Sequence, residues 1–145
     1  MDFSNSQEIR LKSILSAISK RVQQRVDSID SVIKFQHTGI ESWFKVELIA
    51  TLESLGEEVD GLKNIGPDII LSRDELNIEI KAATDFNPSY FRDGALKYGV
   101  PCLFLGSGEN LKKIERLKAM SQIRVIGMEY PKGLYTWVIG CIIPA

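Results

Sequence analysis

The sequence predicts one α/β domain built on a mixed β-sheet, and three observations predict it. Between residues 4 and 34, apolar residues recur at three- and four-residue steps without Gly or Pro, as in an amphipathic helix. After Gly56 the pattern changes to alternating apolar and polar residues, which is typical of strands. Helix-like and strand-like segments then follow one another to the end of the chain, which favours an α/β fold.

An N-terminal helix is expected first, followed by elements in the order α-β-β-β-α-β-α-β-β. A long helix is predicted over residues 4–34, and residues 1–36 are expected to form an N-terminal helical arm. Residues 37–145 are expected to form the main domain. Within it we expect helices over 40–55, 88–98 and 109–120 and strands over 57–62, 68–71, 77–82, 101–105, 123–129 and 135–143.

The composition is that of an ordinary globular protein, with 145 residues, 44% hydrophobic and 26% charged. The formal net charge of -1 argues against a chain-wide basic coat for nucleic acid. No apolar run approaches the roughly 20 residues of a membrane helix, and the N-terminus lacks a signal-peptide layout. We therefore expect a cytoplasmic protein without a membrane partner.

Cysteine and histidine are scarce, which narrows the possible chemistry. Cys102 and Cys141 lie in apolar strand-like runs and are expected to be buried free thiols. With these two cysteines and a single histidine, His37, the chain lacks the ligands of a structural zinc site. Catalysis, if present, is therefore expected to depend on carboxylates and lysine.

Two carboxylates and a lysine are expected to converge on the second and third strands. Asp68 opens the second strand, and Glu79 and Lys81 alternate with apolar residues in the third. Residues two apart in a strand share a face, so Glu79 and Lys81 project together. The short connection predicts an antiparallel hairpin that brings Asp68 beside Glu79 at a solvent-exposed edge. Such a patch suits a hard cation such as Mg²⁺, although a turn aspartate and a solvated ion pair are the simpler alternative.

These residues resemble the motif of the PD-(D/E)XK nuclease superfamily, which includes restriction endonucleases and archaeal Holliday junction resolvases. The matching residues are Pro67-Asp68 and Glu79-Ile80-Lys81. The element order over residues 40–106 is also similar to the α-β-β-β-α-β core of that family. The resemblance implies a restriction endonuclease-like mixed sheet flanked by helices. It also implies an endonuclease that hydrolyses phosphodiester bonds in DNA with Mg²⁺, for which Mn²⁺ would substitute.

The resemblance also implies roles for individual residues. Asp68, Glu79 and the carbonyl of Ile80 would hold the metal, and Lys81 would position the attacking water. The family often adds a glutamate from the preceding helix, for which Glu41 and Glu47 are the candidates. Glu41 lies on the apolar stripe of that helix, and Glu47 lies about 100° from its centre. We therefore expect Glu41 to point toward the sheet, with plain surface charge as the alternative for both.

Further residues are candidates for contact with DNA. Lys20, Arg21 and Arg25 form part of a basic segment in the N-terminal helix. Tyr90, Arg92 and Lys97 lie on the helix after the third strand, which in similar nucleases borders the DNA. A solvated helix face explains these charges equally well.

The apolar stripe of the N-terminal helix needs a surface to cover it. Either its own domain or a second copy of the chain would do so, and a symmetric homodimer would also supply two active sites for two DNA strands. Two other classes of function fit the sequence: a catalytically silent nuclease-fold module that binds nucleic acid or assembles, and an oligomerisation protein built on the helical arm. Binding of a divalent ion is expected only of the nuclease.

Overall fold

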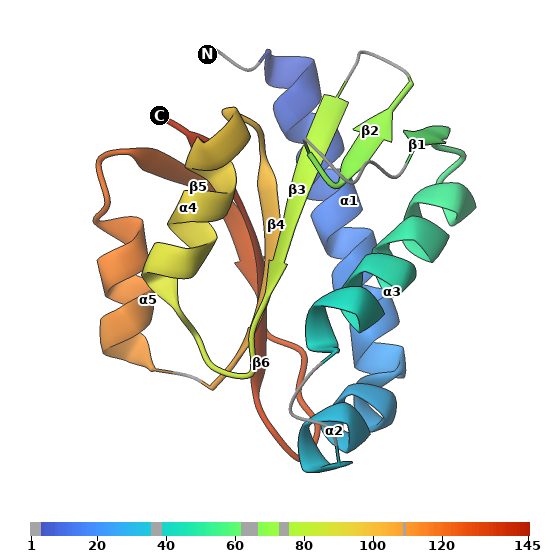
Figure 1. Cartoon of the computed structure of the whole chain (residues 1–145), viewed down its shortest axis with the longest axis vertical. Helices are drawn as coiled ribbons and strands as arrows, with labels where there is room; N and C mark the ends of the chain where they lie inside the picture. The colour runs from blue at the N-terminus through green and yellow to red at the C-terminus, as the bar shows by residue number, and fades with distance from the viewer. Residues whose placement is uncertain (1–3, 36–38, 62–66, 73–75, 109) are drawn as a thin grey trace.

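The computed structural model describes residues 4–35, 39–61, 67–72, 76–108 and 110–145. It has an α/β fold in which a six-stranded mixed sheet lies between two layers of helices (Figure 1). The helices are α1 (Asn5–Gln24), α2 (Val26–Phe35), α3 (Ile40–Ser54), α4 (Pro88–Tyr98) and α5 (Leu111–Lys118). The strands are β1 (Val59–Gly61), β2 (Ile69–Leu71), β3 (Leu76–Ala82), β4 (Cys102–Ser107), β5 (Ile123–Glu129) and β6 (Trp137–Pro144). No helix in these ranges combines the length and apolarity needed to cross a bilayer.

The strand order in the sheet is β1-β2-β3-β4-β6-β5. Strands β2 and β3 pair in the predicted antiparallel arrangement, with Ile69 opposite Ile78. Strands β3 and β4 are parallel, with Glu79 opposite Cys102, because the chain crosses over through α4 between them. Strand β6 then pairs antiparallel with both β4 and β5, which confirms the predicted C-terminal hairpin.

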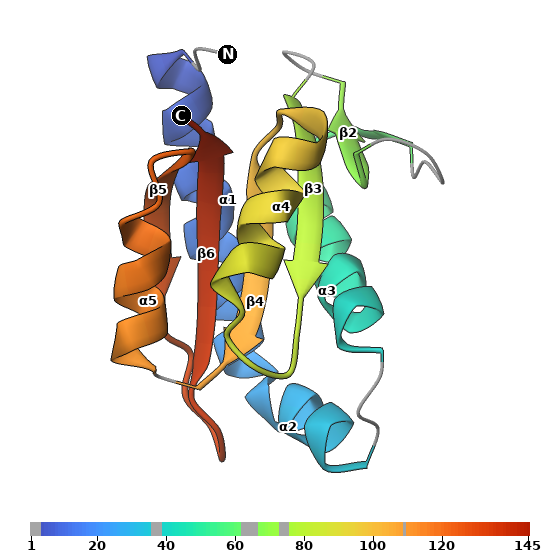
Figure 2. The same cartoon turned by 60° about the vertical axis from the view of Figure 1, so that its left-hand side comes forward.

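The two faces of the sheet are covered by different helices (Figure 2). Helices α1 and α3 cover one face, and α4 and α5 cover the other. Because side chains alternate along a strand, Leu103 and Leu105 of β4 pack into the first layer, whereas Cys102 and Phe104 pack into the second. Both layers are therefore apolar, and the sheet is buried on both sides along its centre.

The N-terminal segment differs from the prediction. The single helix expected over residues 4–34 is two helices, because Arg25 leaves the helical conformation with φ -117° and ψ 22°. Ile14, Ile18 and Val22 of α1 are at most 1% exposed and belong to the core formed by α3 and the sheet. The segment expected to be an arm is thus a layer of the domain, and of the two expected covers for its apolar stripe, its own domain or a second copy, the structure shows the first.

Helix α4 has the predicted bounds, because both its ends carry local signals. The side chain of Asn87 accepts a hydrogen bond from the amide of Tyr90, and Pro88 occupies the first turn. Gly99 ends the helix in the left-handed region, at φ 64°. This placement lays α4 across β3 and β4 and brings Tyr90 close to the end of β3.

Cys102 and Cys141 are buried free thiols, as predicted. Burial raises the pKa of Cys141 to about 12 and that of Cys102 well above its ordinary value. Both side chains therefore stay protonated and unreactive at neutral pH.

Candidate active site

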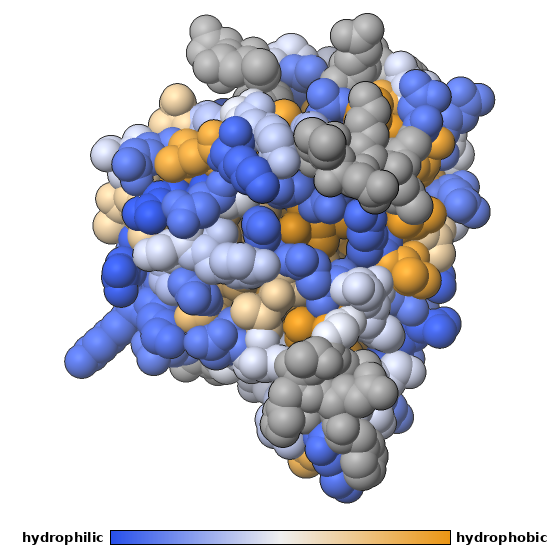
Figure 3. All heavy atoms as spheres, in the orientation of Figure 1, coloured by the Kyte–Doolittle hydropathy of each residue, from blue (hydrophilic) through white to orange (hydrophobic). Residues whose placement is uncertain are grey.

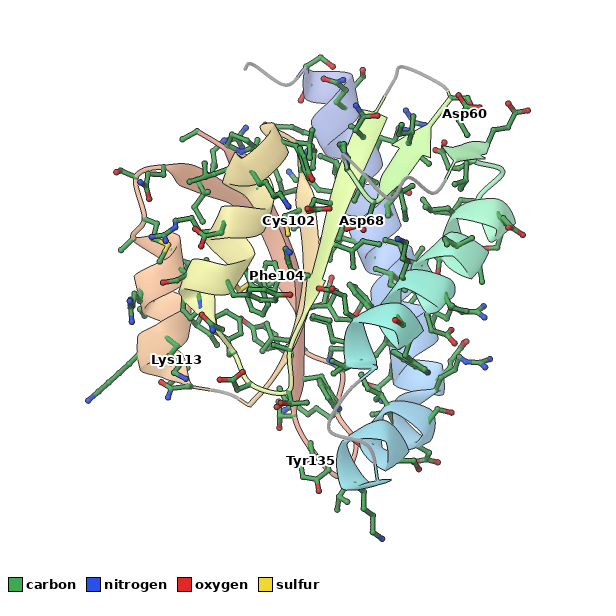
Figure 4. All side chains as sticks on the ribbon, in the orientation of Figure 1. Asp60, Asp68, Cys102, Phe104, Lys113 and Tyr135 are labelled. Atoms are coloured by element: carbon green, nitrogen blue, oxygen red, sulfur yellow. The ribbon has the colours of Figure 1, made fainter. Side chains whose placement is uncertain are left out.

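The candidate site lies at the edge of β3, just beyond the point where its pairing with β2 ends. In the described part of the chain, β2 pairs with β3 only from Leu76 to Ile78. Beyond that point two carboxylates, in place of a neighbouring strand, accept hydrogen bonds from the backbone amides of β3. The Ile80 amide donates to Asp68 Oδ2 at 2.9 Å, and the Ala82 amide donates to Glu41 Oε1 at 3.1 Å. Figure 4 shows Asp68 beside β3, on the side of β2 and α3.

Asp68 and Glu79 meet at this edge. The backbone amide of Asp68 donates to Glu79 Oε1 at 3.3 Å, which fixes the two residues against each other. A strand residue presents its amide and carbonyl to the same side, so the Ile80 carbonyl lies on the edge that Asp68 covers. Glu79 itself is only 4% exposed, which corrects the expectation that all these residues lie at a solvent-exposed edge.

The proximity of the two carboxylates changes their ionisation. Burial, a hydrogen bond to Asp68 and the negative charge of Asp68 together raise the pKa of Glu79 to about 7. Burial also pushes the pKa of Asp68 upward, but hydrogen bonds with Glu79, the Ile80 amide and Lys45 outweigh it, and the net pKa is lowered. Below about pH 7 the pair therefore keeps one proton, which lies on Glu79. A metal cation bound between the two carboxylates would compensate their charge in place of this proton.

This pKa predicts a pH-dependent stability. Between pH 4.5 and about 7 the folded chain keeps a proton on Glu79 that the unfolded chain releases, so the free energy of unfolding falls as the pH rises through this range. Glu79→Gln removes this loss, and its Tm relative to the wild type should rise by a few degrees from pH 5, just above the lower end of this range, to pH 8, about one unit above its upper end, with EDTA present. Because the pKa of Asp68 is lowered from 3.8, its titration changes the stability only below about pH 3.8, outside this range. A constant Tm difference would contradict the assignment.

Lys81 is held between β3 and α4. Its ammonium lies 4.8 Å from the centre of the Tyr90 ring, a cation–π contact. One helical turn further along α4, Gly94 allows the helix to approach the aliphatic stem of Lys81 closely. A Cβ at position 94 would lie 2.7 Å from Lys81 Cγ and 2.8 Å from Cys102 Sγ. The sequence held a signal for this contact, since glycine in a helix interior is unfavourable unless packing requires it.

Gly94→Ala should therefore destabilise the protein, although alanine is the better helix former by about 1 kcal/mol. The added methyl group would displace Lys81 and Cys102, and overpacking of this kind typically costs roughly 1–3 kcal/mol. Thermal or urea unfolding measures the change. Asp93→Ala, at an exposed neighbouring position of α4, is the control and should have little effect. Stabilisation by Gly94→Ala would show that α4 does not press on Lys81.

Tyr90, which contacts Lys81, also binds Glu41 of α3. The Tyr90 hydroxyl donates to Glu41 Oε1 at 3.0 Å, the oxygen that also accepts from Ala82. Burial and the charge of Glu41 raise the pKa of Tyr90 to about 12, so its hydroxyl stays a neutral donor. Tyr90 was expected at the DNA border, and the structure gives its hydroxyl a partner inside the site.

Glu47 lies elsewhere. It is 4% exposed and pairs with Arg21 and Arg25 of the first helical layer. The distance from Arg25 Nε to Glu47 Oε1 is 3.1 Å. Glu47 is thus neither a surface charge nor part of the site, and two arginines expected at a DNA groove bind this buried carboxylate.

Lys45 is a member of the site that the sequence analysis missed. Its ammonium lies 3.2 Å from Asp68 Oδ1 and supplies a second positive charge to the carboxylate pair. Lys45 lies four residues after Glu41 on α3, so both side chains point from one face of the helix. That spacing was the available signal.

The other predicted contact residues are spread more widely. Lys97 lines a pocket of about 510 Å³ together with Lys81, Tyr90, Asp93 and Leu96. Arg92 pairs with its neighbour Asp93 at 3.0 Å, and Lys20 is exposed on α1. His37 lies outside the described residues. The face of the molecule in Figure 3 is mainly hydrophilic, with hydrophobic residues in separate small patches.

The donor set suits Mg²⁺ better than a softer metal. The described residues contain no group of three or more His, Cys, Asp or Glu placed to hold a metal ion. Asp68 and Glu79 offer two carboxylates, and the carbonyl of Ile80 lies on the same edge. Mg²⁺ commonly binds one or two protein carboxylates and keeps several waters, so this set fits it.

Comparison of the chain with family models, with curated proteins and with solved structures gives no match. The function therefore has to be argued from the site itself.

Proposed function

We propose that this chain is a Mg²⁺-dependent endonuclease that hydrolyses phosphodiester bonds in DNA at a site of the PD-(D/E)XK type. The main support is the meeting of Asp68 and Glu79 at the open edge of β3, next to Lys81. Two adjacent carboxylates repel each other when both are ionised, which is part of the reason why Glu79 keeps its proton up to about pH 7, and a divalent cation would relieve this repulsion.

In this proposal each residue has a separate task. Asp68, Glu79 and the Ile80 carbonyl would hold Mg²⁺ or Mn²⁺, which supplies positive charge for the transition state and lowers the pKa of a bound water. Lys81, fixed by Tyr90 and Gly94, would orient that water toward the phosphorus. Glu41 would hold the end of β3 and the Tyr90 ring in place beside Lys81, through its hydrogen bonds from the Ala82 amide and the Tyr90 hydroxyl.

The substrate would lie across the pocket lined by Lys81 and Lys97, with the lysines facing its phosphates. Lys20 and Arg92 stay candidates for further phosphate contacts, as do Arg21 and Arg25 if the substrate draws them from Glu47. A homodimer and a cytoplasmic location also stay predictions. Sedimentation of the full chain at tens of micromolar tests the dimer, and a monomer there would contradict it.

A silent nuclease-fold module that binds nucleic acid is the second candidate. One observation favours it: Lys45 already neutralises part of the charge on Asp68 without a metal. Such a module would bind DNA equally well in Mg²⁺ and in EDTA and would leave it uncut.

The decisive experiment is a cleavage assay on supercoiled, linear, branched and single-stranded DNA, each with Mg²⁺, Mn²⁺ or EDTA. Cleavage that needs the metal supports the nuclease. Added Mg²⁺ or Mn²⁺ should also raise the Tm, because a ligand that binds only the folded chain stabilises it. The absence of both effects would overturn the proposal.

A further inference from the structure

We propose that Lys45 competes with the metal for Asp68 and becomes a phosphate-binding residue once the metal is bound. This inference rests on the proposed function, because it concerns the same site. One side chain would thus have two anionic partners in turn, a carboxylate in the metal-free chain and a nucleic-acid phosphate in the metal-bound one.

The hydrogen bonds of Asp68 show why the competition arises. Oδ2 accepts from the Ile80 amide at 2.9 Å, and the backbone amide of Asp68 is tied to Glu79. The carboxylate is therefore held in one orientation. Oδ1 receives the Lys45 ammonium at 3.2 Å. A divalent cation that binds Asp68 together with Glu79 meets this ammonium at the same carboxylate, and two positive charges so close repel each other.

The two lysines of the site differ in their freedom to move. The stem of Lys81 passes beneath Gly94, where no space remains for even a methyl group. Lys45 lies on the outer side, with 27% of its side chain exposed, and Asp68 is 29% exposed. Both side chains of this partly buried pair reach solvent, so water can solvate the ammonium and the carboxylate when they separate, which limits the cost of separating them. Lys81 is thus fixed, and Lys45 is free to exchange partners.

The nearest alternative carboxylate on α3 is already engaged. Glu41, one turn before Lys45, accepts hydrogen bonds from Ala82 and Tyr90 through Oε1. A flexible ammonium with three donors binds a phosphate oxygen as a point charge without a demanding geometry. The phosphodiester brought to the metal is the strongest anion within reach of a released Lys45.

The test compares Lys45→Met with the wild type in two titrations of the full-length chain. In the first, calorimetry with Mn²⁺ alone should give roughly fivefold tighter binding for Lys45→Met, because a competing positive charge is gone. Lys45→Arg keeps the charge and should stay within about twofold of the wild type. Lys113→Met on α5, which lies away from Asp68 in Figure 4, is the control for lysine loss.

The second titration uses a labelled DNA duplex, in a Lys81→Met background that prevents cleavage. With Mn²⁺ present, Lys45→Met should weaken binding about five- to tenfold and reduce the salt dependence by about one phosphate contact. Without metal the same substitution should have almost no effect, because no cation then displaces the Lys45 ammonium from Asp68.

The results separate this inference from the function on which it rests. If the wild type binds Mn²⁺ but Lys45→Met binds it no more tightly, Lys45 does not compete and the inference is overturned. A loss of DNA affinity that is equal with and without Mn²⁺ would also overturn it. If neither protein binds Mn²⁺, the proposed nuclease function fails, and the inference fails with it.

Discussion

Lys81→Met is expected to reduce metal-dependent DNA cleavage by roughly 10²- to 10⁴-fold, the range typical of a lost proton-handling group. Methionine keeps the apolar stem that packs under Gly94 but removes the ammonium over Tyr90. Mn²⁺ affinity should stay within a few-fold of the wild type, because Lys81 is not a proposed ligand. The measurement is a single-turnover rate on the preferred DNA substrate, together with the Tm of the variant.

Substitution of the two carboxylates should differ from Lys81→Met, because it should affect metal binding as well as cleavage. Asp68→Asn and Glu79→Gln are expected to lose both cleavage and Mn²⁺ binding, while Lys113→Met should keep both. Full activity of purified Lys81→Met, or wild-type Mn²⁺ binding by Glu79→Gln, would show that the reaction is centred elsewhere.

The choice of substitution follows from burial. Asp68 accepts from the Ile80 amide, and alanine there would leave a partly buried donor without its partner, which costs about 1–3 kcal/mol. Glu79 is almost completely buried. Alanine variants would therefore mix a loss of stability with a loss of chemistry, and the isosteric amides keep the two apart.

The fold was predictable wherever the chain carries a local signal. Pro88 and Gly99 mark the ends of α4, and the alternation through Ile78 and Ile80 marks β3. The break between α1 and α2 has no such signal, because it depends on contacts distant in sequence. Asp30, in α2, accepts hydrogen bonds from Trp137 Nε1 at 3.0 Å and from the Leu134 amide at 2.8 Å. These anchors hold α2 at the lower end of the sheet (Figure 1), which no periodicity reveals.

The helix phase was sufficient to orient Glu41 but not Glu47. A single apolar stripe describes a helix with one neighbour, whereas α3 packs against both the sheet and α1. Glu47 points toward α1, where Arg21 and Arg25 meet it, and this second neighbour is invisible in the wheel of α3 alone. The site residues on β3 were easier to place, since the period-two pattern of a strand leaves only two faces.

The two glutamates of α3 therefore provide a reciprocal test. Glu41→Gln should slow cleavage at least about tenfold with little loss of stability. The amide oxygen of glutamine can still accept from Ala82 and Tyr90, so the contacts persist and only the negative charge beside Tyr90 is lost. Single-turnover rates and Tm values of both variants measure the two effects separately.

Glu47→Gln should do the reverse. Removing a buried carboxylate from its arginines costs several kcal/mol when the partners are fully buried. Arg21 and Arg25 are 33% and 48% exposed, so water can solvate them, and we expect a loss of only about 1–2 kcal/mol. In a chain of this size that lowers the Tm by a few degrees. The cleavage rate of the folded protein should not change. A slower reaction in Glu47→Gln than in Glu41→Gln would mean that the acid supporting Lys81 comes from the face of α3 that contacts α1, and the proposed site would have to be redrawn around it.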